Sequence, residues 1–239
     1  MTRKIVSAIT ALAMLALMAY SGARLWAIDE EIKAERRLHI ELLQHKPEPV
    51  PGDLADPLAG LREQNPDIVG WIAVPFTNID YPIVQAKDND YYLRRDLNGD
   101  YAKPGTVFMD YRCAKDGSGY SIVYGHNMKS GSMFGTLGRF EEKAFFDAHQ
   151  EGRILFEDGW HTLRFFAFLI VRENNSAVYA LPQSPDLRSG LALRAKHYRE
   201  FDAAETGRLV ALSTCSYAYQ GARMVLIGEI MQKAEDFLC

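Results

Sequence analysis

The sequence predicts a mainly β domain behind a long N-terminal helix. From about residue 53 onward, short apolar or alternating runs are separated by glycine, proline and asparagine, a pattern typical of β-strands. Two largely apolar runs near the C-terminus have the composition of central strands that are buried on both faces. Residues 5–23, in contrast, contain no charged side chain. Together these observations indicate a closed or nearly closed β-structure with a few helices packed outside it.

The N-terminus predicts a membrane anchor. Arg3 and Lys4 precede the charge-free run of residues 5–23, and Arg24 ends it. As a helix, this run would rise roughly 28 Å, close to the thickness of the hydrocarbon core of a bilayer. The alternative is a cleaved signal peptide, because the small residues at 21–23 resemble a cleavage site, although the apolar part of such peptides is usually only about 7–15 residues long. Basic residues before the run favour a cytoplasmic N-terminus and an extracellular domain in the cell membrane.

The chain is expected to contain three segments. Residues 1–28 are the anchor, and residues 29–52 form a helical stalk that ends in a proline-rich linker. The stalk is rich in charged residues, and three prolines followed by Gly52 interrupt any helix at its end. Residues 53–239 then form the folded domain.

Within the domain, the runs of apolar residues predict eight strands and three helical pieces. The predicted strands are residues 68–74, 79–85, 106–110, 121–125, 153–157, 162–172, 208–214 and 224–230. The predicted helical pieces are a turn at 89–95, a short helix at 144–149 and a longer surface helix at 186–201. Leucines at 187, 191 and 193 with basic residues among them support the last of these.

Composition narrows the range of functions. The chain has 239 residues, 48% hydrophobic and 24% charged, which is ordinary for a globular protein. A formal net charge of -4 gives no basic surface for phosphates, so we expect no nucleic-acid partner. The sequence has no Cys-x-x-Cys or His-Glu-x-x-His motif and no acidic calcium loop, so we expect no metal and no cofactor.

The three cysteines differ in their surroundings. An odd number leaves at least one thiol unpaired. Cys113 lies in a turn-like stretch and Cys239 is the last residue, whereas Cys215 ends an apolar strand-like run. If the runs before and after residues 216–222 pair as antiparallel strands, Cys215 and Arg223 lie at the same level, and the guanidinium can donate hydrogen bonds to an oxyanion. The alternatives are a small buried apolar residue for Cys215 and a charge at a strand edge for Arg223.

His126 follows another predicted strand and lies directly after a glycine. A histidine in that position can project into a cleft and exchange protons near neutral pH. A lone histidine is more often an ordinary surface or core polar residue. Because 89 positions separate His126 from Cys215, spacing alone does not join them.

Two stretches resemble the signature blocks of the sortase family. One is Tyr-Gly-His-Asn-Met-Lys-Ser-Gly-Ser-Met-Phe-Gly at residues 124–135, and the other is Leu-Ser-Thr-Cys at 212–215 with Arg223 after it. Other stretches are similar, in the same order, to class B sortases, the group that includes anchors of haem-uptake proteins in Gram-positive bacteria. They are residues 65–72, 81–85, 89–93 and 108–110.

The resemblance extends over roughly residues 55–231, essentially the whole predicted domain. Ala211 departs from the family, which often has threonine there, and Ser216 occupies a position that the family varies. We expect the first change to affect packing rather than chemistry, and the second leaves the local substrate contacts open, so neither alters the three residues that the resemblance marks as catalytic.

The resemblance implies an eight-stranded sortase-type β-barrel with catalytic residues His126, Cys215 and Arg223. Cys215 would form a thioester with a threonine of a sorting signal, Arg223 would stabilise the oxyanion, and His126 would transfer protons. Four further positions match substrate-binding positions of the family: Asn89, Leu93, Tyr124 and Ser213. Each has a plainer alternative: a helix cap for Asn89, core packing for Leu93 and Tyr124, and a hydroxyl bonded to the backbone for Ser213.

The expected partners follow from the same resemblance. They are secreted proteins with a C-terminal sorting signal, the amine of a lipid-linked cell-wall precursor or a pilin lysine, and the membrane itself. A cysteine protease or amidase that hydrolyses its thioester would use the same residues. A non-catalytic receptor tethered by one helix is the alternative from a different functional class.

Overall fold

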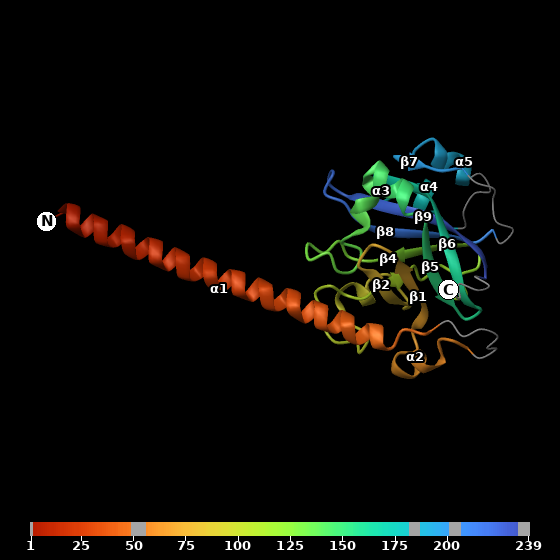
Figure 1. Ribbon diagram of the computed structural model, residues 1–239, viewed down its shortest axis with the longest axis horizontal. Coiled ribbons are helices and arrows are strands. Elements are labelled where there is room, and N and C mark those ends of the chain that lie inside the picture. Colours follow the sequence, from red (N-terminus) through yellow and green to blue (C-terminus); the bar gives the residue numbers. More distant parts are fainter. Residues whose placement is uncertain (1, 49–55, 182–186, 201–206, 234–239) are drawn as a thin grey trace. The chain divides into compact units, whose positions relative to one another are not determined.

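The computed structural model describes residues 2–48, 56–181, 187–200 and 207–233 (Figure 1). The chain divides into two compact units, Met1–Glu41 and Leu42–Cys239. The predicted segment boundary at residues 52 and 53 lies outside the described residues. Leu42 and Leu43 already pack against core clusters of the second unit.

Helix α1 (Thr2–Gln44) is continuous through the predicted anchor and the first part of the predicted stalk. Its first half exposes large apolar side chains, among them Leu12, Leu15 and Leu17. Further along, Lys33 forms an ion pair with Asp29 at 2.6 Å, an arrangement suited to a helix in water. Among the described residues, α1 is the one helix whose length and composition would allow it to cross a membrane.

The second unit is built on a single closed sheet. Its strands are β1 (Ile68–Val74), β2 (Ile79–Val84), β3 (Phe108–Met109), β4 (Tyr120–Tyr124), β5 (Glu151–Phe156), β6 (Gly159–Arg172), β7 (His197–Tyr198), β8 (Leu209–Cys215) and β9 (Ala222–Lys233). Their order is β5-β1-β2-β3-β4-β8-β9-β6-β7, and β5 also pairs with β6. That last pairing closes eight strands into a barrel and leaves β7 as an extension on β6. The predicted eight-stranded barrel is therefore confirmed.

Aromatic side chains fill the interior. Phe134, Phe140, Phe165 and Phe168 belong to the largest core cluster, and all four are fully buried. Gly152 lets β5 approach this cluster, because a Cβ there would lie 2.8 Å from the ring of Phe165. Removing one such ring would typically cost about 3–5 kcal/mol of stability.

The helical pieces are short. They are α2 (Ala59–Gln64), η1 (Tyr91–Arg94), η2 (Leu137–Glu141), α3 (Lys143–Ala148), α4 (Ser176–Tyr179) and α5 (Leu187–Ala192). The turn predicted at 89–95 and the helix predicted at 144–149 correspond to η1 and α3.

The surface helix predicted at 186–201 is confirmed over Leu187–Ala192 and is wrong for residues 193–200. Helix α5 ends at Ala192, and residues 186 and 201 lie outside the described residues. Strand β5 pairs only with the first part of β6. Along the same edge of β6, the backbone groups after that part therefore need partners from another segment. The chain after α5 supplies the partners: Lys196 N donates to Phe168 O at 2.8 Å, and β7 pairs with β6.

Candidate active site

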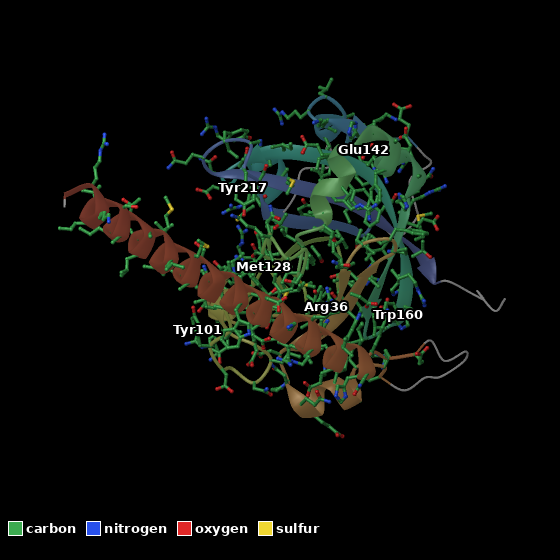
Figure 2. The ribbon with its side chains drawn as sticks, turned by 60° about the vertical axis from the view of Figure 1, so that its left-hand side comes forward. Arg36, Tyr101, Met128, Glu142, Trp160 and Tyr217 are labelled. Carbon is green, nitrogen blue, oxygen red and sulfur yellow. The ribbon has the colours of Figure 1, made fainter. Side chains whose placement is uncertain are left out.

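Cys215 and Arg223 face each other across the β8–β9 hairpin. They are paired residues in the antiparallel register, as the sequence predicted. Nη1 of Arg223 donates a hydrogen bond to Sγ of Cys215 at 2.9 Å. Cys215 is solvent-exposed, so its sulfur is accessible to a substrate. Tyr217, labelled in Figure 2, lies in the loop that joins these two strands, on the other side of the domain from Trp160.

Parallel pairing of β4 with β8 brings the histidine segment to the same edge of the barrel. Tyr124 is paired with Ser213, and the pairing ends one residue before His126 with a bond from Gly125 N to Ser213 O at 3.2 Å. Asn127 Nδ2 donates to the carbonyl oxygen of Cys215 at 2.8 Å. Cys215, the last residue of β8, and His126, two residues after the end of β4, therefore lie at the ends of adjacent strands although they are distant in sequence.

The imidazole of His126 is hydrogen-bonded to a backbone carbonyl of η1. Its Nε2 forms a 2.8 Å hydrogen bond with the carbonyl oxygen of Leu93. A carbonyl oxygen only accepts hydrogen bonds, so Nε2 carries a hydrogen and Nδ1 is left to exchange a proton.

Glu173 holds the other side of the Arg223 guanidinium. Its Oε2 accepts a hydrogen bond from Nη2 at 2.8 Å, while its backbone N donates to Gly221 O at 2.9 Å. The guanidinium thus uses one terminal nitrogen for the sulfur of Cys215 and the other for a carboxylate. Sequence reasoning missed Glu173, since nothing in its local pattern separates it from other charged residues at strand ends.

A cavity of about 560 Å³ adjoins Arg223. Asn89 and Tyr124 are among the side chains that line it, so two of the four predicted substrate-binding residues border it. The alternative of a helix cap does not hold for Asn89, because the N-cap position of η1 is Asp90 and the backbone N–H groups of Asp90 and Tyr91 donate to Oδ1 of Asp88.

Leu93 and Ser213 do not belong to the described lining of this cavity. The side chain of Leu93 packs against a core cluster, and its carbonyl orients His126. Ser213 is 1% exposed, and its hydroxyl is hydrogen-bonded to Oη of Tyr179 at 2.8 Å. Both residues are therefore connected to the site through a hydrogen-bonded neighbour, His126 for Leu93 and Tyr179 for Ser213.

A fully buried carboxylate, that of Asp110, lies beside the cavity. Its oxygens accept hydrogen bonds from Arg112 Nε and Nη2, both at 2.8 Å, from Asn89 Nδ2 at 3.0 Å and from Tyr124 Oη at 3.1 Å. Burial alone would raise the pKa of Asp110, but the hydrogen bonds from Arg112 and Asn89 outweigh burial and hold that pKa below its ordinary value. Asp110 is therefore ionised at neutral pH. In the sequence, the feature that could have marked Asp110 as part of the site is its position within residues 108–110, one of the stretches similar to class B sortases.

Cys113 provides an internal comparison for thiol reactivity. It is buried, and burial raises its pKa to about 11, so its thiol stays protonated at neutral pH. We expect iodoacetamide at pH 7.5 to alkylate the exposed Cys215 at least about 100-fold faster than Cys113. Peptide mapping by mass spectrometry would measure both rates; equal labelling of the two in the folded protein would contradict this expectation.

The sequence and the fold match known proteins over most of the domain. A family model described as the sortase domain matches residues 72–231. Sortase B of Listeria monocytogenes is 33% identical over 193 residues, covering 77% of this chain and 78% of the relative.

Two solved structures extend the similarity to three dimensions. Sortase B of Bacillus anthracis has a TM-score of 0.71 and 29% identity, covering 85% of this chain and 99% of that one. A class B sortase of Streptococcus pyogenes involved in pilus biogenesis has a TM-score of 0.66 and 31% identity, covering 72% of this chain and 97% of that one. With the family model, the relatives and the closed barrel in agreement, this chain belongs to the sortase family, as a cysteine transpeptidase of class B.

Proposed function

We propose that Cys215, His126 and Arg223 form the catalytic centre and cleave a C-terminal sorting signal of secreted proteins. The observation that carries the proposal is the 2.9 Å hydrogen bond from Arg223 Nη1 to Cys215 Sγ beside a cavity. A nucleophilic sulfur next to a fixed guanidinium suits a reaction in which negative charge develops on a carbonyl oxygen.

In the first half of the reaction, the thiolate of Cys215 attacks the carbonyl carbon of a threonine in the sorting signal. Arg223 stabilises the oxyanion that forms, a role typically worth about 3–4 kcal/mol. The peptide C–N bond breaks, and the imidazolium of His126 gives its proton to the leaving amine. The products are a thioester on Cys215 and a free C-terminal fragment.

In the second half, an acceptor amine attacks the thioester carbonyl. Neutral His126 takes a proton from the amine, the C–S bond breaks, and the thiolate of Cys215 is regenerated. The hydrogen bond from His126 Nε2 to Leu93 O leaves Nδ1 for both transfers. A thiol suits this exchange because it both attacks well and leaves well.

The cavity beside Arg223 is the proposed binding site for part of the sorting signal. Asn89 and Tyr124 contribute directly to its wall. Leu93 contributes by orienting His126, and Ser213 by orienting Tyr179.

We propose residues 1–28 as an uncleaved membrane anchor, residues 29–52 as the stalk and linker, and residues 53–239 as the catalytic domain. The exposed apolar half of α1 supports the anchor. Arg3 and Lys4 favour a cytoplasmic N-terminus and a single-pass topology, with the domain on the extracellular side of the cell membrane.

The proposed acceptor is the amine of a lipid-linked cell-wall precursor. A pilin lysine is the second candidate, because a class B sortase of Streptococcus pyogenes that shares 31% identity with this chain is involved in pilus biogenesis.

Product analysis tests the transfer. The full chain in detergent would be incubated with a fluorogenic peptide library that varies the residues around a fixed threonine, with triglycine or a lysine-containing peptide as acceptor. We expect an amide adduct that contains the threonine acyl group and grows with acceptor concentration. A hydrolysed acid as the sole product at every acceptor concentration would indicate a protease or amidase instead.

A further inference from the structure

The cavity beside Arg223 is bordered by segments that are far apart in sequence. Asn89 lies just before η1, and Tyr179 is the last residue of α4. Asp110 follows β3 and contacts the first of these borders directly, through the 3.0 Å hydrogen bond from Asn89 Nδ2. Tyr124 is attached to the same carboxylate oxygen, Oδ2 of Asp110, at 3.1 Å.

Arg112 extends this network to the second border. Its guanidinium binds both oxygens of Asp110, and Nη2 also donates to the carbonyl oxygen of Tyr179 at 3.3 Å. The side chain of Asp110 is 0% exposed and that of Arg112 is 38% exposed, so the ion pair runs from the interior to the cavity wall. Such a planar, bidentate arrangement fixes the orientation of the two side chains as well as pairing their charges.

Helix α4 has only four residues and depends on tertiary contacts for its position. Besides Arg112, the hydroxyl of Tyr120 donates to Val178 O at 3.0 Å, and the hydroxyl of Tyr179 is bonded to Ser213. The rings of Tyr124 and Tyr179 are stacked with centroids 6.5 Å apart. Arg112 links α4 by hydrogen bonds to the carboxylate that also holds Asn89, whereas Tyr124 reaches α4 only through the stacking of its ring on Tyr179.

From this geometry we infer that Asp110 and Arg112 are positioning residues that fix the two borders of the cavity relative to each other. They hold Asn89 and Tyr124 on one side and Tyr179 on the other, so that the sorting peptide meets a preformed site. The inference rests on the proposed function in one respect, namely that the peptide occupies this cavity. Neither residue takes part in bond making or proton transfer.

Arg112→Lys tests the pair with little disturbance of the fold, because the side chain is partly exposed and the charge is kept. A lysine has one ammonium group and cannot bind both oxygens of Asp110 together with Tyr179 O. Misplacement of a binding border by about 1 Å can cost on the order of 100-fold, so we expect kcat/KM to fall about 10- to 100-fold, mainly through a higher KM. The rate at which iodoacetamide alkylates Cys215 should stay at the wild-type value.

Arg188→Lys is the matched control. Arg188 pairs with Glu229, a carboxylate that is 2% exposed and, like Arg188, is not part of the described lining of the cavity. This variant should keep the KM of the wild-type chain for the same library-selected peptide with triglycine as acceptor. Asp110→Asn, compared at a temperature at which thermal unfolding shows it folded, should raise KM as Arg112→Lys does.

Hydrogen exchange of the amides in Ser176–Tyr179 gives a readout that needs no substrate. Exchange there should be faster in Arg112→Lys than in wild type or in Arg188→Lys. Wild-type KM together with wild-type exchange in Arg112→Lys would overturn the positioning role. A wild-type chain that turns over no library peptide would overturn the proposed function instead, while the exchange result would still decide whether the pair joins the two borders.

Discussion

Replacing Cys215 by alanine is expected to abolish both cleavage of the sorting peptide and transfer to the amine. Alanine supplies no nucleophile, and loss of a nucleophile in an enzyme with a covalent intermediate typically lowers kcat by at least about 10⁴-fold. Because Cys215 lies exposed at the end of β8, the substitution removes no buried contact and the fold should persist. The initial rate of adduct formation, and intact-mass detection of the acyl-enzyme, would measure the effect.

Cys113→Ala is the matched control for this experiment. It removes a thiol that is buried, that accepts a hydrogen bond from Ile122 N at 3.4 Å and that does not line the cavity as described. We expect it to keep transfer activity, with some loss of thermal stability. If Cys215→Ala still formed the amide adduct at a rate comparable with Cys113→Ala, the nucleophile would have to be another residue.

Much of the barrel was predictable because its strands are specified locally. Residues 68–74 were predicted as a strand, and β1 has the same bounds, since this apolar run is buried on both faces almost throughout. Two of the leucines that suggested a long helix do belong to α5, but the third, Leu193, is 90% exposed. The sequence contains no local sign that the second part of β6 needs a partner along its edge. The chain after α5 pairs there, and the helix therefore ends before it.

In the candidate site, too, some residues could be predicted from the local sequence and others could not. Cys215 and Arg223 could be joined by reasoning about a hairpin, because a short loop between two apolar runs sets which residues face each other. His126 could not, because its place depends on a parallel pairing of β4 and β8 that connects distant parts of the chain. The resemblance to sortases supplied that link. Asp110 lies in a stretch similar to class B sortases, but its contacts at the cavity become visible only in the fold, and the contact of Glu173 with Arg223 has no signature in the local pattern.

Replacing Arg223 by lysine is expected to lower kcat about 10²- to 10³-fold, although the positive charge is kept. The guanidinium holds Cys215 Sγ through Nη1 and Glu173 Oε2 through Nη2, at 2.9 and 2.8 Å. A single ammonium group cannot span the sulfur and the carboxylate, and it lacks the planar set of donors that fixes the direction of a hydrogen bond. The loss should therefore appear in the chemical step, as a lower rate of thioester formation in single-turnover measurements with excess enzyme.

Arg172→Lys separates this effect from a general change of charge near the site. Arg172, the last residue of β6, is paired with Ala222, which precedes Arg223 in β9. The guanidinium of Arg172 lies over the ring of Tyr219, 5.5 Å from the ring centroid. Both substitutions keep the positive charge and replace a guanidinium by a single ammonium group. In the hydrogen bonds described, however, only Arg223 contacts the sulfur of Cys215. We expect Arg172→Lys to react within about threefold of wild type. Comparable rates in the two variants would show that position 223 contributes charge alone, and the oxyanion would then need a different donor.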